Sequence, residues 1–95
     1  MAKLTVTQEQ VEAQIVNCVI ETFSNKTTVC IFTLLNGFVI VESSSCVDPA
    51  NYDIEIGKEI CRKAAIEKIW MLEGYVLQTL ISVDQAYKKI AGGII

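Results

Sequence analysis

The stretch that decides the fold runs from Cys46 to Leu77 and reads CVDPANYDIEIGKEICRKAAIEKIWMLEGYVL. It opens on helix-start chemistry, because Asp48 can cap a first turn in which Pro49 supplies its fixed φ without losing a needed donor. Asn51 or Asp53 can cap again one turn later. From there the pattern predicts a helix to about residue 81, roughly 28 residues or 40 Å at 1.5 Å per residue.

Two apolar stripes run along this predicted helix, which indicates two separate contacts. The first stripe, expected to cover a sheet, consists of Ile54, Cys61, Ala65, Ile69, Leu72, Val76 and Leu80. A second stripe is best explained by another chain. The predicted oligomer interface consists of Ile66, Trp70, Leu77 and Ile81. For Trp70 alone, burial in an ordinary core is an equally good interpretation, because tryptophan is enriched both there and at interfaces.

Glycines bear on the course of this helix, since each costs about 1 kcal/mol relative to alanine. Gly57 predicts a close approach of the backbone to a neighbour, and Gly74 predicts a kink or a break. Residues 83–89 extend the helix or form a short extra one, and Gly92-Gly93 is expected to end it.

The residues before the long helix begin with a short one. Thr7 and Gln10 form a capping-box pattern, in which each side chain satisfies a backbone N–H of the other residue. Val11 and Ile15 then share one helical face, and we expect the helix to end near Asn17.

A small antiparallel sheet follows, because β-branched and aromatic residues dominate residues 19–41. We expect strands at 27–35 and 38–43, joined by a two-residue type I′ turn at Asn36-Gly37. A third strand at 19–23, ending in a turn at 24–26, is left open. The predicted fold class is α+β: a short N-terminal helix, a small antiparallel meander and a long C-terminal helix packed across the sheet.

The composition predicts one domain that associates with itself. The 95 residues form a single domain over 1–95, with an ordered core at about 7–82 and a C-terminal extension at 83–95. Hydrophobic residues make up 52% of the chain, more than one small core can hide. The uncharged stretch at 29–41 contains the Asn-Gly turn, so we expect no membrane partner. Association into a homo-oligomer is the remaining way to bury this apolar surface.

Charge and cysteine usage exclude several function classes. Eight basic and eleven acidic residues give a net charge of −3 without a Lys/Arg cluster, so we expect no direct binding to duplex nucleic acid. The chain has no histidine, and its four cysteines lack metal-ligand spacing, so we predict no metal, no cofactor and no enzyme activity. The thiols are expected to be reduced and mostly buried. Cys46 before a helix start is the one candidate nucleophile, and we interpret it as a small residue that fills the corner.

A binding site is the more promising hypothesis. Lys58 and Arg62 are four residues apart on one helix face, where they can hold a phosphate or carboxylate. Asn51 and Tyr52 lie at the helix start, whose N–H groups favour anions. In a symmetric oligomer these four residues could converge on a small nucleotide. The alternative is that Lys58 and Arg62 only form exposed ion pairs with nearby acids.

A family resemblance rests on residues spread over most of the chain. They are Asn36-Gly37-Phe38, Cys46-Val47-Asp48-Pro49, Asn51, Asp53, Ile56-Gly57, Lys68, Trp70, Leu72-Glu73-Gly74-Tyr75 and Leu77. This combination resembles the small tailed-phage proteins typed by gene product 49 of phage N4 and gene 66 of phage Sf6. The similarity covers roughly residues 7–80. Ser45 stands where the family leads us to expect alanine, and residues beyond Ile81 fall outside the resemblance.

The resemblance implies an origin rather than a chemistry. It suggests an accessory protein in the cytoplasm of an infected bacterium, and such proteins commonly bind and disable something of the host's. The leading hypothesis is an oligomer that sequesters a small anionic host molecule, such as a defence-signalling nucleotide. The alternatives are an inhibitor or adaptor that binds a host protein, and a small structural or replication-assembly subunit of the phage.

Overall fold

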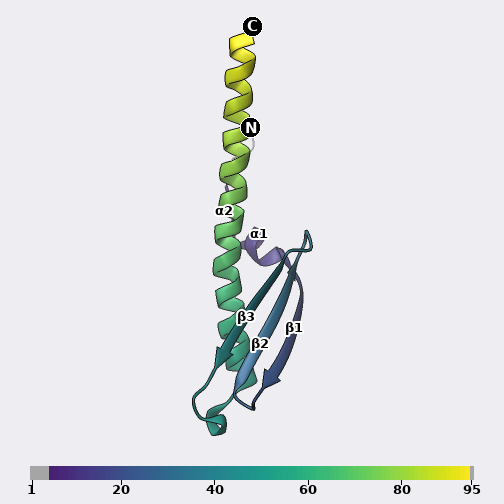
Figure 1. The fold of residues 1–95 in the computed structure, drawn as a ribbon, viewed down its shortest axis with the longest axis vertical. Helices are drawn as coiled ribbons and strands as arrows, with labels where there is room; N and C mark the ends of the chain where they lie inside the picture. The colour runs from purple at the N-terminus through teal and green to yellow at the C-terminus, as the bar shows by residue number, and fades with distance from the viewer. Residues whose placement is uncertain (1–4, 95) are drawn as a thin grey trace.

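The computed structural model describes the backbone of residues 5–94 and the side chains of residues 5–86. Its elements are α1 (Gln8–Ala13), β1 (Ile15–Phe23), β2 (Thr27–Leu34), β3 (Val39–Ser45), a 3-10 turn (Pro49–Asn51) and α2 (Ile54–Ile94) (Figure 1). The strands form one antiparallel sheet in the order β1-β2-β3, and α2 packs across it. The predicted α+β fold is confirmed. Among residues 5–94 the antiparallel meander has three strands, so the third strand that the sequence left open is present.

Helix α1 begins as the capping-box pattern predicts. The N–H of Gln10 donates to Oγ1 of Thr7 at 3.2 Å, and the N–H of Thr7 donates to Oε1 of Gln10 at 2.9 Å. The helix ends before Ile15, so the prediction that it reaches Asn17 is wrong. Ile15 instead pairs with Leu34 of β2, and this ladder contact outweighs the weak local preference for helix.

The two hairpin turns differ from the turn chemistry that the sequence predicts. The turn between β1 and β2 has positive φ at both Ser24 (55°) and Asn25 (57°), which is the requirement of a type I′ turn. Between β2 and β3, only Gly37 has a positive φ, at 89°. There the Oδ1 of Asn36 accepts a bond from the N–H of Phe38 at 2.9 Å. The hairpin at Asn36-Gly37 is confirmed, but its assignment as type I′ is wrong.

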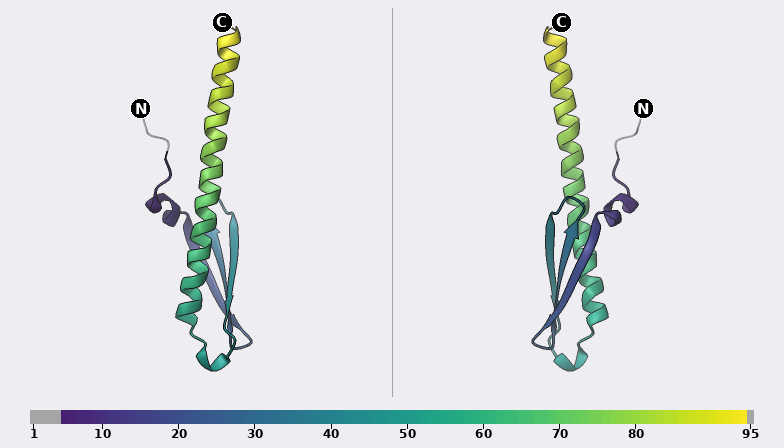
Figure 2. Two further views of the ribbon diagram at one scale, coloured as in Figure 1. Left: turned by 90° about the vertical axis from the view of Figure 1, so that its left-hand side faces the viewer. Right: turned by 90° about the vertical axis from the view of Figure 1, so that its right-hand side faces the viewer.

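The two faces of the sheet differ in what covers them. On one face lie α2 and α1, and the other face has no helix or strand against it among residues 5–94 (Figure 2). The buried core between sheet and helices consists of Val11, Cys30, Phe32, Leu34, Ile40, Cys61, Ala65 and Ile69. The middle of the first predicted stripe therefore covers the sheet, as expected.

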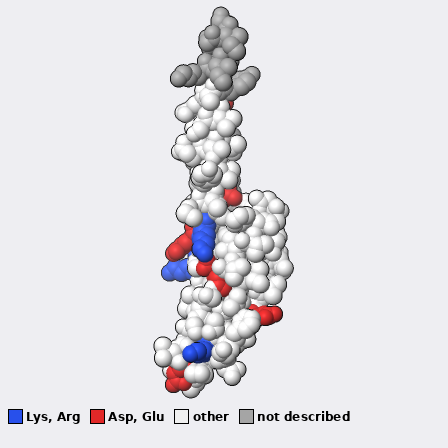
Figure 3. Space-filling view, viewed as in Figure 1, with Lys and Arg blue, Asp and Glu red and all other residues white. Residues whose placement is uncertain are grey.

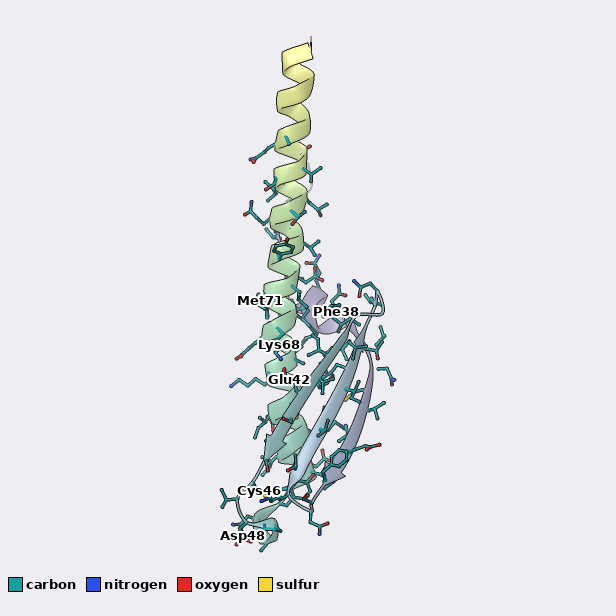
Figure 4. The ribbon with its side chains drawn as sticks, in the orientation of Figure 1. Phe38, Glu42, Cys46, Asp48, Lys68 and Met71 are labelled. Carbon is teal, nitrogen blue, oxygen red and sulfur yellow. The ribbon has the colours of Figure 1, made fainter. Side chains whose placement is uncertain are left out.

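Two contacts fix α2 on the sheet. At Gly57, an added Cβ would lie 2.1 Å from Oγ1 of Thr28, so the close approach predicted for this glycine is confirmed. Further along the helix, Lys68 points toward Glu42 of β3 and forms an ion pair with it (Figure 4). These contacts set the height and rotation of the helix above β2 and β3.

Helix α2 is longer than the sequence predicts, because its 41 residues continue from Ile54 to Ile94. It does not break at Gly74, and the stop predicted at Gly92-Gly93 is wrong. Residues 83–94 continue this helix, while residue 95 lies outside the described residues. About half of α2 extends past the sheet, which gives the molecule its dimensions of 70 × 21 × 20 Å (Figure 1). Within the described residues, no helix combines the length and the apolar character needed to cross a membrane.

Candidate functional site

A polar corner connects β3 to α2 at the end of the sheet opposite the Asn36-Gly37 hairpin. Asp48 caps the 3-10 turn, since its Oδ1 accepts a bond from the N–H of Ala50 at 2.9 Å. The Sγ of Cys46 donates to the carbonyl of Asp48 at 3.3 Å, and both residues lie at this corner in Figure 4. Asp53 then caps α2 through a 2.9 Å bond from the N–H of Glu55. These caps hold the corner in one conformation.

Tyr52 ties the corner to two strands. Its hydroxyl lies 2.8 Å from Oγ1 of Thr22 on β1 and 2.8 Å from Oγ1 of Thr28 on β2. Thr28 is completely buried and contacts Gly57 of α2, so the tyrosine ring reaches the point where helix and sheet are closest. A hydroxyl that serves two threonines orients the ring strongly. Tyr52 thus shapes the corner and cannot also offer its hydroxyl freely to a ligand.

A small cavity of about 120 Å³ opens between this corner and the end of the sheet. Its lining residues are Lys26, Thr28, Ser44, Ser45, Cys46, Asn51, Tyr52, Asp53, Ile56, Gly57 and Ile60. Lys26 reaches the cavity because its backbone carbonyl accepts a 2.9 Å bond from the N–H of Cys46, which closes this end of the sheet. The lining combines one ammonium, several hydroxyls and one side-chain amide, and the single carboxylate there already caps α2.

Lys58 and Arg62 lie on a neighbouring open surface. They line a shallow hollow of about 320 Å³ together with Glu55, Ile56 and Glu59. Ile56 also borders the corner cavity, so the two hollows adjoin. In residues 5–86 the observed ion pair joins Lys68 to Glu42, and neither Lys58 nor Arg62 has an ion-pair partner there. Because Glu55 and Glu59 border the same hollow, the alternative that these cations only form exposed ion pairs stays a prediction.

The four residues predicted as a ligand site thus fall into two adjoining groups. Asn51 and Tyr52 line the corner cavity, whereas Lys58 and Arg62 line the hollow beside it. Sequence reasoning missed Lys26, the one basic residue that lines the cavity. The signal that could have found it is the hairpin itself, since a turn at residues 24–26 places that lysine at the same sheet end as the residues that follow β3.

Three of the residues predicted as an oligomer interface, Ile66, Trp70 and Leu77, lie beside α1. Trp70 is 37% exposed, and its Nε1 donates to Oε1 of Gln8 at 3.2 Å. Ile66, Leu77 and Ile81 are half-buried. Part of this stripe is therefore occupied by the chain's own N-terminal segment, and its role in assembly stays a prediction.

The cysteines lie mainly in the core. All four are free, with Cys30 and Cys61 buried and Cys18 and Cys46 half-buried. Burial raises the pKa of the Cys30 thiol to about 12, and the adjacent Cys61 and Cys18 thiols add to this. A thiol that stays protonated is a poor nucleophile, so Cys30 acts as a small core residue.

The sequence that folds in this way matches a family of known phage proteins. The model of a family of phage proteins, described as the N4 Gp49/phage Sf6 gene 66 family, matches residues 6–81. That range includes α1, the sheet, the corner with its cavity, and the part of α2 that covers the sheet. This chain therefore belongs to the phage protein (N4 Gp49/phage Sf6 gene 66) family, as the resemblance of its motifs predicts. No curated protein and no solved structure matched it.

Proposed function

We propose that this phage protein acts by binding a small anionic molecule of the infected host, such as a defence-signalling nucleotide, and not by catalysis. The observation that carries the proposal is the corner cavity, in which Lys26 and several neutral polar groups lie next to two unpaired cations on α2. Sequestration needs only affinity and concentration, so it requires no group that turns over a substrate.

The lining of the cavity suits phosphate oxygens. The Lys26 ammonium carries donors only, and the hydroxyls of Ser44 and Ser45 and the amide of Asn51 add neutral donors. None of these four side chains binds another group except Ser45, whose Oγ lies 2.8 Å from Oγ1 of Thr27. A charge-assisted bond from Lys26 would supply most of the affinity, and the neutral donors would fix the orientation of the anion.

The size of the cavity points to a ligand that extends beyond it. Pockets that enclose small organic ligands usually measure about 300–1,000 Å³. At about 120 Å³, the corner cavity has room for a phosphate-sized group but not for a whole nucleotide. The remainder of the ligand would pass Ile56 into the adjoining hollow, where Arg62 can bind a second phosphate. Glu55 and Glu59 in that hollow can accept bonds from ribose hydroxyls, which favours a nucleotide over a free inorganic anion.

Isothermal titration calorimetry with a panel of cyclic dinucleotides, cyclic mononucleotides and ADP-ribose derivatives tests this proposal. Inorganic phosphate serves as the minimal ligand. We expect at least one nucleotide to bind with one site per chain, more tightly than phosphate. If a sample shown to be folded by circular dichroism releases no heat with any of them, the proposal is wrong.

Variants locate the site. Removing a charge-assisted bond costs about 1.5–3 kcal/mol, so Lys26→Ala and Arg62→Ala should each weaken binding about 10- to 150-fold. The matched control is Lys63→Ala, because Lys63 is next to Arg62 in sequence but lines neither the corner cavity nor the hollow that contains Lys58 and Arg62. Equal loss in all three variants would indicate non-specific attraction by positive charge and would contradict a built site.

A further inference from the structure

The apolar stripe that covers the sheet does not stop where the sheet stops. Cys61 and Ile69 are 0% and 1% exposed beneath the sheet. Val76, Leu80 and Val83 continue the stripe at spacings of three and four residues, yet they are 49%, 58% and 61% exposed. We call residues 75–94 the projecting half of α2. An isolated helix of this length is marginal in water, so its stripe requires a surface to pack on.

Among the described side chains of the projecting half, residues 75–86, Gln78, Thr79 and Ser82 are polar, and Leu77 and Ile81 of the second stripe are half-buried. The amide of Gln78 lies 3.4 Å from the hydroxyl of Ser82, and the hydroxyl of Thr79 donates to the carbonyl of Tyr75. A helix with a single apolar stripe packs against one surface and leaves its other side in water. Val76 and Leu80 border a hollow with Thr5 and Val6 of the N-terminal segment but stay half exposed, so an apolar partner surface can still cover this stripe.

The chain itself presents such a surface on the uncovered face of its sheet. Exposed apolar side chains on this face are Val19 (46%), Phe23 (49%), Ile31 (39%), Val39 (49%) and Val41 (56%). Val19, Ile31 and Val41 are in register across all three strands and form a continuous row. In the view of Figure 3, the part of the projecting half below the grey residues shows mostly uncharged atoms. A sheet packed on one side only leaves this face unpartnered.

We propose that two copies of the chain pair reciprocally, each laying the projecting half of its α2 across the uncovered sheet face of the other. A twofold axis perpendicular to the helices, at the hairpin end of the sheet, produces this arrangement. The two sheets then lie end to end in one layer, between two antiparallel helices. The stripe of each α2 faces the same way along its whole length, first toward its own sheet and then toward the partner's.

Dimensions support this pairing over a simpler one. A face of three strands about 4.8 Å apart and seven residues long measures about 14 by 23 Å, or roughly 330 Å². A helix about 10–12 Å across covers most of that width, so two such contacts, counted on the sheet side and on the helix side, remove about 900–1,100 Å² from water, close to the lower limit for a specific interface. Pairing only the two projecting halves along about 30 Å of helix would remove about 600 Å², which is less than a specific interface needs. It would also leave both sheet faces bare.

The test uses one variant on each surface. In the proposed dimer, Ile31 at the centre of one sheet comes opposite the middle of the partner's projecting half, near Val83. We expect the wild-type chain to be a dimer by light scattering and native mass spectrometry, and Ile31→Lys and Val83→Glu to be monomers. Gln78→Glu and Asn25→Lys, on the polar side of the helix and in a turn, are the matched controls and should remain dimers.

Mixing the two monomeric variants gives the decisive result. A mixed dimer has one wild-type contact and one contact in which the introduced carboxylate meets the introduced ammonium, so the equimolar mixture should dimerise. A monomeric wild type overturns the proposal. A dimeric Ile31→Lys indicates pairing through helices alone, and a dimeric Val83→Glu indicates stacking of sheets alone, and either result overturns it as well. The outcome does not depend on the proposed ligand, because neither Ile31 nor Val83 lines the cavity.

Discussion

Replacing Gly57 with alanine tests the closest contact between α2 and the sheet. The added Cβ would lie 2.1 Å from Oγ1 and 2.8 Å from Cβ of Thr28. Thr28 has no room to move, since it is completely buried and its hydroxyl is bonded to Tyr52. The helix must therefore lift away from β2, or the threonine must rotate and give up that bond.

Opposing terms set the size of the effect. Overpacking a filled contact costs about 1–3 kcal/mol, and loss of the bond between Thr28 and Tyr52 adds about 1 kcal/mol. Alanine offsets about 1 kcal/mol of this, because it is the better helix former. We therefore expect Gly57→Ala to lower the free energy of unfolding by about 1–3 kcal/mol. The chain offers a matched control in Gly74, where an added Cβ meets nothing within 4 Å.

Urea denaturation followed by circular dichroism at 222 nm measures both variants, at one protein concentration because dimer stability depends on it. Gly74→Ala should raise the free energy of unfolding by up to about 1 kcal/mol, the opposite sign to the same substitution at Gly57. A Gly57→Ala chain as stable as wild type would falsify the packing of α2 against Thr28. A Gly74→Ala chain that loses stability would show that this position is not open.

Two further predictions concern the corner and the core. Tyr52→Phe should lower stability by about 1–2 kcal/mol, because the buried hydroxyl of Thr28 loses its partner, while Tyr75→Phe should have little effect at a side chain 74% exposed. The pKa of Cys30, raised from 9.0 to about 12, means that the folded chain keeps this proton while the unfolded chain releases it between those values. Stability should therefore fall as pH rises from 9 to 12, and the gap between wild type and Cys30→Ala in urea should narrow.

The sequence is informative where local chemistry decides the structure. The caps at Thr7, Asp48 and Asp53 and the close approach at Gly57 were predictable because each depends on residues near in sequence or on the absence of a side chain. The end of α1 was not predictable in this way. Ile15 fits a helical face equally well, and only its pairing with Leu34 across the sheet places it in a strand.

In the candidate site too, some residues could be predicted from local spacing and others depend on the pairing of the strands. Lys58 and Arg62 were found because an i, i+4 spacing defines one helix face. Lys26 joins Asn51 only through the register of the sheet, which brings the turn after β1 beside the residues that follow β3. Periodicity carries no information on that register, so Lys26 could not be assigned to the cavity from spacing alone.

The two proposals constrain each other through the length of α2. The corner cavity lies at the end of the sheet away from the projecting half, so the proposed twofold axis places the two cavities at opposite ends of the dimer. Lys58 and Arg62 of the two copies then cannot meet around one nucleotide, as a symmetric site on the axis would require. Each ligand would instead be held by the corner of one chain, near the end of the partner's helix. A dimer built in this way has two separate sites, and breaking it leaves the phosphate-binding groups of each corner intact.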